Sequence, residues 1–484
     1  MRFTRYLFLI CLAFYITSYA VHAQTLTPLN AKQLAQLSFS HPPSSHWQFS
    51  YFNEPVFNSN MLILEAGDSH KPKLLLVHGL GALAMQDWFG IINKLTQQYH
   101  VMAIDLPGFG HSDYPKGRYS PENYAATLAS LIKQTDNKPI TVVGHSMGGA
   151  VSLYLAGKYP QYVKKLVLVD AAGILQKTAF IKPITHIPKP SSFLPTFLQT
   201  AFLKNKLAQL NDFTAGIVEE TSINSYITEV LHQSDGAWRL LMGEKPNMNA
   251  ALSLVEQNFS TVVQNVTMPS GIIWGKNDAI APLRTGQVLN HVLVNSELIV
   301  LANSGHVPMK DNTEKFMDSL FSVLNNTAIQ DKSAQPFSQL INETLYCEDK
   351  HTRYFSGHYD RVVIKNCSNV TIEDLSAHSI VITDSLVKMS NVVIKSNDVA
   401  LHVENAVVQI TNSTVTAKYG VDVINSRFDA AGMKINASQY GLKAQGENNI
   451  IFSLSELHSP IYSGVVHGAF EPGTGLFDTV MLSH

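Results

Sequence analysis

Residues 70–173 alternate between short, continuous apolar runs and amphipathic stretches. The apolar runs comprise residues 73–77, 101–104, 140–143 and 166–169. Because they are continuous rather than alternating, these runs are typical of parallel strands that are covered on both faces. A helical pattern, for example at residues 121–133, lies between successive runs. This βα alternation predicts a doubly wound, mostly parallel sheet of the α/β class.

The same pattern resumes at residues 271–274 and 298–301, followed by an amphipathic helix over 312–324. The intervening segment, about residues 174–260, has a different character. It contains prolines and phenylalanines at Pro183, Pro188, Pro190, Pro195, Phe180, Phe193, Phe197, Phe202 and Phe213. We expect a mostly helical cap, inserted over the carboxyl edge of the sheet, in which some of the aromatic side chains pack the cap onto the body.

Beyond residue 345 the chain is rich in β-branched residues, Asn and Ser, and it repeats. Val399-Ala400-Leu401, Tyr419-Gly420-Val421 and Tyr440-Gly441-Leu442 recur about 20 residues apart. Short strands at this period favour a coiled parallel solenoid over a β-sandwich, which also has regular short strands. In its periodicity the region resembles a right-handed parallel β-helix of the pectin-lyase-like kind.

Two cysteines lie one period apart in this region. Cys347 and Cys367 would therefore stand on successive coils. Neighbouring strands are about 4.8 Å apart, and a disulfide accepts Cα separations of about 4.4–6.8 Å. We predict a disulfide that clamps the first turn of the solenoid.

The N-terminus carries a targeting pattern. Arg2 and Arg5 precede an apolar stretch over residues 6–16, and Val21-His22-Ala23 follows. This order predicts a secretory signal cleaved after Ala23. The alternative is an uncleaved anchor, but the stretch is shorter than the roughly 20 apolar residues that span a bilayer. We expect an exported protein, periplasmic or secreted, with no transmembrane span after cleavage.

Composition limits the partners. The 484 residues carry a formal net charge of −2 and show no basic run, which argues against a nucleic-acid partner. The length predicts more than one domain. The histidines are scattered without ligand spacing, so we expect no metal and no other cofactor.

The strongest motif is Gly144-His145-Ser146-Met147-Gly148-Gly149, between an apolar run and a helical segment. It resembles the nucleophile elbow of the α/β-hydrolase fold. In such an elbow a serine sits on a strained turn, where glycines keep Cβ atoms away. The helix that follows points its N-terminus at the site and favours developing negative charge. The resemblance makes Ser146 the candidate nucleophile.

The resemblance also implies partners for this serine, because the family order is serine, acid, histidine. His306, in Ala302-Asn303-Ser304-Gly305-His306, is the candidate general base, ahead of His145 and His78. Asp278, in Trp274-Gly275-Lys276-Asn277-Asp278, is the candidate acid that orients the histidine. The rival acid is Asp170, which ends another apolar run.

Two backbone amides are expected to form the oxyanion hole. The resemblance assigns them to Met147 and to Leu80, the latter within one position. The loop from Asp105 to Ser112 resembles a family signature that shapes a loop, so neither Asp105 nor His111 is expected to be catalytic.

The resemblance covers about residues 50–325. A serine at the elbow implies acyl transfer, because the dehalogenases and epoxide hydrolases of this fold carry aspartate there. The expected reaction is hydrolysis of a small carboxylic ester, with a lipid or another apolar ester as one option, through an acyl-enzyme. The alternatives are C–C bond hydrolysis and acyl transfer to an alcohol.

The predicted organisation is a signal peptide (1–23), an α/β-hydrolase domain (24–325) with its cap at 174–260, a linker (326–344) and a β-helix-like domain (345–484). The last domain is expected to bind a polysaccharide or the cell envelope, or to serve as a structural interaction platform. A third hypothesis is that this domain has a lyase activity of its own.

Overall fold

The computed structural model describes residues 26–135, 137–175, 245–326 and 341–472. The expected signal peptide and most of the expected cap, at residues 176–244, lie outside the described residues. In the part of the chain that is described, no helix combines the length and the apolar character needed to cross a membrane.

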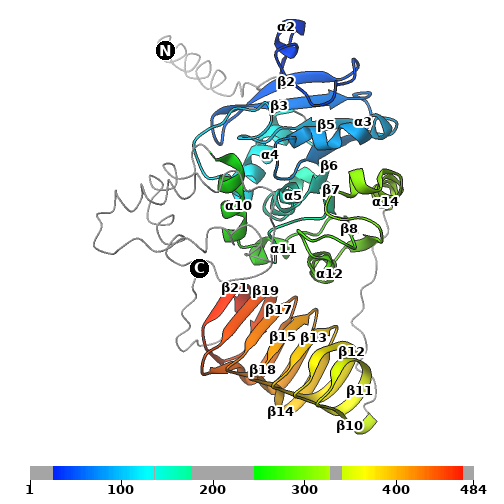
Figure 1. Ribbon diagram of the computed structural model, residues 1–484. Coiled ribbons are helices and arrows are strands. Elements are labelled where there is room, and N and C mark those ends of the chain that lie inside the picture. The colour runs from blue at the N-terminus through cyan, green and yellow to red at the C-terminus, as the bar shows by residue number, and fades with distance from the viewer. Residues whose placement is uncertain (1–25, 136, 176–244, 327–340, 473–484) are drawn as a thin grey trace, which may run out of the picture.

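The N-terminal body is built on a nine-stranded sheet in the order β1-β2-β3-β5-β4-β6-β7-β8-β9 (Figure 1). The strands are β1 (Thr27–Pro28), β2 (Gln48–Glu54), β3 (Ser59–Ala66), β4 (Lys73–Val77), β5 (His100–Ile104), β6 (Ile140–His145), β7 (Val163–Val169), β8 (Ser270–Gly275) and β9 (Ser296–Leu301). From β5 to β9 all neighbours are parallel. Each apolar run of the α/β pattern is one of these strands, so the predicted mostly parallel sheet is confirmed. The antiparallel edge formed by β1, β2 and β3 was not predicted.

The helices cover both faces of this sheet. They are α2 (Ala31–Leu34), α3 (Phe89–Leu95), α4 (Pro121–Thr135), α5 (Met147–Lys158), α10 (Pro246–Glu256), α11 (Ser260–Val263), α12 (Leu283–Val292), α13 (Pro308–Asp311) and α14 (Thr313–Asn325), with 3₁₀ turns η2 (Ala84–Trp88) and η3 (Pro160–Tyr162). One core cluster joins Leu75 and Val77 of β4 to α4, α5 and α12. A second cluster joins Leu74 and Leu76 to α3 and α14. Successive side chains of a strand point to opposite faces, so coverage on both sides requires the continuous apolar runs.

The C-terminal part is a parallel sheet of 12 strands with its own apolar core (Figure 1). The strands are β10 (Ile341–Glu348), β11 (His351–Lys365), β12 (Ser368–Thr383), β13 (Leu386–Ser390), β14 (Val393–Glu404), β15 (Val407–Thr411), β16 (Thr414–Ile424), β17 (Arg427–Ala431), β18 (Lys434–Gln445), β19 (Asn449–His458), β20 (Ile461–Ser463) and β21 (Val466–Pro472). Because β12 pairs with both β13 and β14, the sheet closes on itself.

The repeat found in the sequence corresponds to the register of this sheet. Tyr419 pairs with Val399 on one side and with Tyr440 on the other. Ile380, Leu401, Val421 and Leu442 form an adjacent column and are fully buried. Residues one period apart are therefore neighbours across the sheet, and the apolar positions of each repeat face one shared core.

Asparagine and serine build the turns between the strands. Asn366, Asn405 and Asn425 adopt positive φ angles of 49°, 48° and 44°, a conformation that asparagine tolerates better than most residues. Serine hydroxyls link successive turns: Ser385 Oγ accepts a hydrogen bond from the N–H of Cys367 at 2.9 Å and donates to Thr383 O at 2.6 Å. The abundance of these residues is thus explained by turn geometry.

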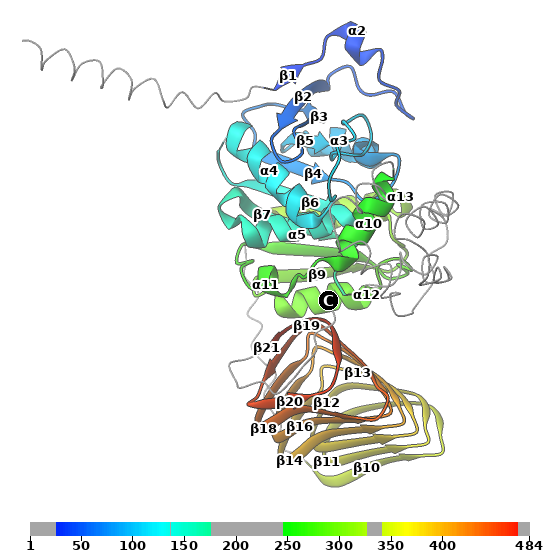
Figure 2. The same cartoon turned by 90° about the vertical axis from the view of Figure 1, so that its left-hand side faces the viewer.

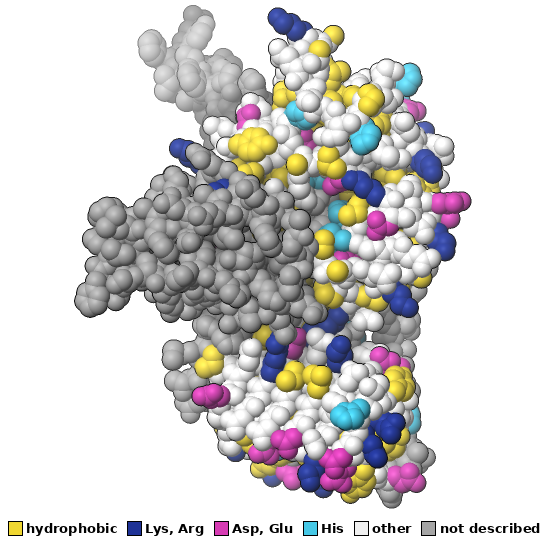
Figure 3. All heavy atoms as spheres, in the orientation of Figure 1, with side chains coloured by type: hydrophobic (Ala, Val, Ile, Leu, Met, Phe, Trp, Pro, Cys, Tyr) yellow, Lys and Arg dark blue, Asp and Glu magenta, His cyan; other side chains and the backbone are white. Residues whose placement is uncertain are grey.

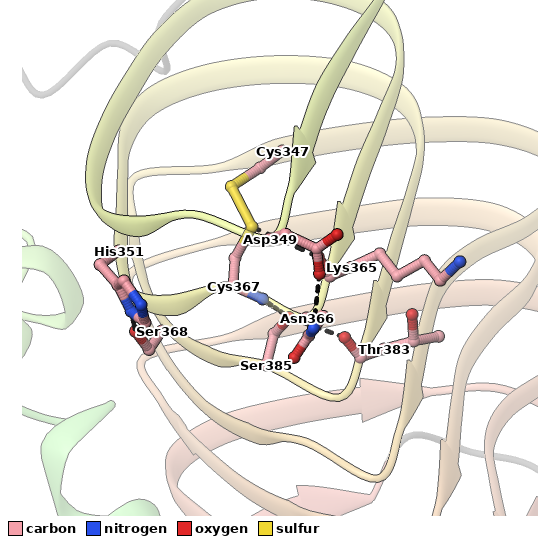
Figure 4. Close-up of a disulfide and its surroundings, with 9 residues drawn as sticks. All are labelled: Cys347, Asp349, His351, Lys365, Asn366, Cys367, Ser368, Thr383 and Ser385. Carbon is pink, nitrogen blue, oxygen red and sulfur yellow. Dashed lines mark hydrogen bonds between the residues drawn. A yellow bond between two sulfur atoms is a disulfide. The ribbon is translucent and has the colours of Figure 1, made fainter.

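The predicted disulfide is present between Cys347 and Cys367, with a Cα–Cα distance of 6.5 Å (Figure 4). It joins the end of β10 to the turn that precedes β12. The side chains of Asp349 and Asn366 are hydrogen-bonded one turn apart beside it. The bond therefore closes the first described turn of the sheet, as the 20-residue spacing predicted.

Candidate active site

Ser146 lies on the tight turn between β6 and α5. Its backbone has φ 52° and ψ −121°, a region that non-glycine residues rarely occupy and that costs about 1–3 kcal/mol. Surrounding contacts hold it there: a Cβ on Gly148 would stand 2.3 Å from Val77 O, and one on Gly144 would stand 2.2 Å from Gly148 O. The two glycines therefore allow the helix to start directly against β4, with the serine at its N-terminus.

His306 and Asp278 meet this serine from two other loops. His306 follows β9, and its Nε2 lies 2.9 Å from Ser146 Oγ. Its Nδ1 lies 2.8 Å from Oδ2 of Asp278, in the loop after β8. Parallel strands end at the same sheet edge, which explains why segments more than 100 residues apart converge. The three residues that the sequence proposed for catalysis are thus brought together in one hydrogen-bonded chain.

Asp278 is held as an acceptor toward His306. Its Oδ1 accepts the N–H groups of Ile280 and Ala281 at 2.7 and 2.9 Å. Burial opposes ionisation, but the hydrogen bond and charge of His306 outweigh it, so the pKa of Asp278 lies below its ordinary value. An ionised Asp278 requires the proton on Nδ1 of His306 and leaves Nε2 free to accept from the serine.

Asp170, the rival acid, lies beside this pair without bonding to the histidine. Its Oδ1 accepts the N–H of Gly275 at 2.8 Å, and its Oδ2 has no hydrogen-bond partner within the described residues. Burial, together with the nearby charge of Asp278, raises the pKa of Asp170 to about 10. Asp170 is therefore a neutral group that braces the end of β8, from which the loop carrying Asp278 departs.

No motif in the sequence indicates the role of His145. Its Nε2 lies 2.7 Å from the backbone oxygen of His306, and the two rings are 5.1 Å apart. Burial, followed by the charge of His306, lowers the pKa of His145 to about 4. His145 is thus neutral and donates to the His306 carbonyl, which fixes the position of that loop.

The loop after β4 approaches the serine on the other side. A Cβ on Gly79 would stand 2.8 Å from Ser146 Cβ, so only glycine permits this approach. Met147 is the first residue of α5, where a backbone N–H has no intrahelical acceptor. The N–H of Gly81 already donates to Asn247 Oδ1 at 3.1 Å. Leu80, between Gly79 and Gly81, remains the candidate second donor.

His78 and Asp105 brace the surrounding loops. His78 Nδ1 lies 2.6 Å from Gly79 O, while its Nε2 accepts the N–H of Leu106 at 3.0 Å. Asp105 accepts the N–H groups of Met85 and His111 at 2.9 and 2.8 Å. Both residues hold backbone in place, and the hydrogen bonds described for them go to these loops and not to Ser146.

One group of side chains has the spacing of a possible metal site. Ligand atoms of Asp170, Asp278 and His306 lie within 4.8 Å of one another. Both ring nitrogens of His306 are engaged, with Asp278 and Ser146, and Asp170 is neutral. The cluster therefore fits proton transfer better than cation binding.

Comparison with known proteins agrees with this architecture. Residues 72–313 match the family model described as alpha/beta hydrolase fold. An uncharacterized protein of Mycobacterium tuberculosis is 30% identical in an alignment of length 271 that covers 53% of this chain and 76% of the relative. Lipase 1 of Psychrobacter immobilis is 26% identical over 266 residues, covering 54% of this chain and 78% of the lipase. An esterase structure from Thermogutta terrifontis, 21% identical, aligns with a TM-score of 0.42 over 57% of this chain and 98% of the esterase.

The matched segment contains the sheet from β4 to β9, the elbow and both loops that meet it. The chain belongs to the alpha/beta hydrolase fold family.

Proposed function

We propose that the protein is a serine hydrolase that cleaves carboxylic esters through an acyl-enzyme, with Ser146 as nucleophile, His306 as base and Asp278 as orienting acid. The observation that carries the proposal is the unbroken chain from Ser146 Oγ through His306 to Asp278, with distances of 2.9 and 2.8 Å. A serine hydroxyl is a weak nucleophile and needs such a base within hydrogen-bond reach.

The geometry suits two successive acyl transfers. Ser146 Oγ attacks the ester carbonyl carbon while Nε2 of His306 takes the hydroxyl proton. The oxyanion of the tetrahedral intermediate accepts hydrogen bonds from the amides of Met147 and Leu80. The C–O bond to the alcohol then breaks as His306 returns the proton to the leaving oxygen. Water then attacks the acyl carbon as His306 takes its proton. The C–Oγ bond breaks, and His306 returns that proton to Ser146 Oγ as the acid leaves.

An apolar acyl or alcohol group is the substrate feature we favour. The phenylalanines of the 174–260 segment support it, as does the similarity to a protein named Lipase 1. The same residues would serve C–C bond hydrolysis or acyl transfer to an alcohol. A set of p-nitrophenyl esters of rising chain length, a diketone and an added alcohol acceptor distinguishes these reactions by their products.

The experiment that tests the proposal replaces the nucleophile. Ser146→Ala should abolish ester hydrolysis and labelling by a fluorophosphonate. The matched control is Ser130→Ala on α4, a serine that only receives a hydrogen bond from Gln134, and it should keep both. Hydrolysis or labelling that persists in Ser146→Ala would refute the proposal.

We also propose that the protein works outside the cytoplasm, in the periplasm or as a secreted protein. The pattern of residues 1–23 supports export, and the disulfide between Cys347 and Cys367 is of a kind that persists in oxidising compartments. Fractionation of cells that express the full chain tests this: mature protein that begins at Gln24 is expected outside the cytoplasm.

For the C-terminal sheet we infer a right-handed parallel β-helix that serves as an interaction platform. Residues one repeat apart pair in parallel on neighbouring strands, so that each repeat forms one turn, and this supports the assignment. Because Asn and Ser side chains are used within the turns, they do not by themselves favour sugar binding. On the face drawn in Figure 3, basic and acidic side chains are interspersed over this domain. Binding of the full chain to polysaccharide or to cell envelopes would instead support a surface-binding module.

A further inference from the structure

The C-terminal sheet is tied to the hydrolase domain through one arginine of α12. The Arg284 guanidinium donates twice to the Asp429 carboxylate, at 3.0 Å each, and to Thr411 Oγ1 at 2.8 Å. It also donates to the backbone oxygens of Ile410 and Asp429 at 2.9 and 3.3 Å. All three nitrogens of the side chain thus donate to the C-terminal sheet, in five hydrogen bonds. The Arg284 and Asp429 side chains are only 13% and 17% exposed, so this pair is part of a packed interface.

Other contacts extend this interface along α12. Asn412 Nδ2 donates to Gln287 O at 3.1 Å, and a Cβ on Gly432 would stand 3.2 Å from Val288. Ala431 and Leu454 of the C-terminal sheet belong to the apolar cluster that fills one face of the hydrolase sheet. Both views show the C-terminal sheet directly below α12 and α11 (Figures 1 and 2). The two parts therefore share a core as well as polar contacts.

The clamped helix follows directly from the loop that carries the candidate acid. Arg284 is the second residue of α12, and Asp278 lies six positions before it. The intervening turn is stiff, because Asp278 Oδ1 accepts two of its N–H groups and Trp274 Nε1 donates to Ala281 O at 2.8 Å. A shift of the first turn of α12 would thus be transmitted to the Asp278 carboxylate.

A second contact holds the segment that follows Asp170. Ser453 Oγ of β19 donates to Leu175 O at 3.1 Å, five residues after Asp170. The C-terminal sheet therefore holds the chain just beyond both carboxyl groups of the site.

We propose that the C-terminal sheet is a positioning element of the active site, and that Arg284 is the positioning residue through which it holds α12 and the Asp278 turn in register with His306. This inference rests on the proposed function, because it concerns the alignment of the same triad. It makes the C-terminal sheet a part of the hydrolase rather than an appended module that could be lost without effect on turnover.

The test measures ester hydrolysis by the full-length chain with a p-nitrophenyl ester. Arg284→Met removes all five hydrogen bonds but keeps an apolar stem. Because a misplacement of about 1 Å costs up to about 100-fold, we expect kcat to fall by about ten-fold or more while KM changes by less than about two-fold. Asp429→Asn keeps the shape of the contact and should give a smaller fall in kcat.

The matched control is Lys365→Met. Lys365 pairs with Glu348 at 3.4 Å at the far end of the C-terminal sheet, where both side chains are more than half exposed. Its kcat and KM should equal those of the wild type. If Arg284→Met does not fold, Asp429→Asn against Lys365→Met provides the same comparison.

A double-mutant cycle separates positioning from general destabilisation. If Arg284 acts through Asp278, then Arg284→Met should cost little further activity in an Asp278→Asn background, since effects on one catalytic unit are not additive. Full additivity, or a kcat within two-fold of the wild type for folded Arg284→Met and Asp429→Asn, would overturn the inference. Activity that survives Ser146→Ala would instead overturn the proposed function.

Discussion

The replacement Asp278→Asn tests the electrostatics of the site without changing its shape. The aspartate Oδ1 accepts the N–H groups of Ile280 and Ala281, so the asparagine oxygen must stay on that side. The opposite orientation would place an NH₂ group against two donors. The asparagine NH₂ therefore faces Nδ1 of His306, in the place of the oxygen now 2.8 Å away.

The consequence is a change of tautomer. A donor opposite Nδ1 makes that nitrogen an acceptor and moves the ring proton to Nε2, the atom 2.9 Å from Ser146 Oγ. The histidine then cannot take the serine proton. A wrong tautomer in a Ser-His-Asp triad reduces kcat by about 10⁴-fold, equivalent to about 5.5 kcal/mol of transition-state stabilisation. We expect this loss with little change in KM.

The matched control is Asp170→Asn, the same exchange in the neighbouring carboxyl group. An asparagine there still accepts from the N–H of Gly275, and it replaces a carboxyl group that is neutral because burial raises its pKa to about 10. Its kcat should stay within about three-fold of the wild type. Steady-state hydrolysis and the rate of fluorophosphonate labelling measure both variants.

The pH dependence of the stability of Asp170→Asn tests whether the pKa of Asp170 is raised in the folded chain. The folded chain keeps a proton on Asp170 that the unfolded chain releases above about pH 3.8. Asp170 therefore costs stability that grows as the pH rises through that value. Asp170→Asn should raise the unfolding temperature more at pH 8 than at pH 4. A large loss of kcat in Asp170→Asn, with a small one in Asp278→Asn, would refute the assignment and exchange the two roles.

Three further predictions follow from single contacts. Gly79→Ala should lower kcat by about ten-fold or more, because its Cβ would stand 2.8 Å from the Cβ of the candidate nucleophile. The control is Gly90→Ala, where the added Cβ meets open space. It should leave stability unchanged or raise it by up to about 1 kcal/mol. Burial lowers the pKa of His145 to about 4 from 6.5, so the folded state loses up to about 3 kcal/mol as the pH falls from 6.5 to 4. His145→Asn should flatten that dependence in urea unfolding, and an unchanged slope would contradict it. Replacing Cys347 and Cys367 by serine should lower the local stability of β10 and β11 by about 3 kcal/mol, seen as faster hydrogen exchange there. The kcat should not change. A fall in kcat would contradict this and show that the first turn matters for the site.

Local pattern was enough to predict the strands of the hydrolase sheet and the repeat of the C-terminal sheet. Strands such as β4 are buried on both faces and must be apolar throughout, so their sequences mark them. The β2–β3 hairpin was not predicted. β2 mixes buried with exposed positions and lacks a continuous apolar run. β3 does contain one, at residues 61–64, but that run has no βα alternation beside it, because β3 pairs antiparallel with β2 in the hairpin.

Some residues of the candidate site can likewise be found from sequence motifs, and others only from the structure. The elbow around Ser146 carries its own signature, because the turn requires small residues within a few positions. The loops of Asp278 and His306 were found through their resemblance to family motifs. His145 was judged a weaker candidate for the base, and nothing in its sequence neighbourhood indicates its hydrogen bond to the His306 carbonyl.

The sequence favours Asp278 over Asp170 only through its resemblance to a family motif, since both residues follow a buried strand. Only the folded chain shows that Asp278 contacts His306. The surroundings of the two acids also shift their pKa values in opposite directions, so Asp278 is ionised and Asp170 is neutral. The same is true of Arg284 and Asp429, 145 positions apart. Residue type and short-range spacing determine local structure and the chemistry that is available. Contacts between distant segments, which exist only after folding, decide which groups are paired, which are neutral and which parts of the chain act together.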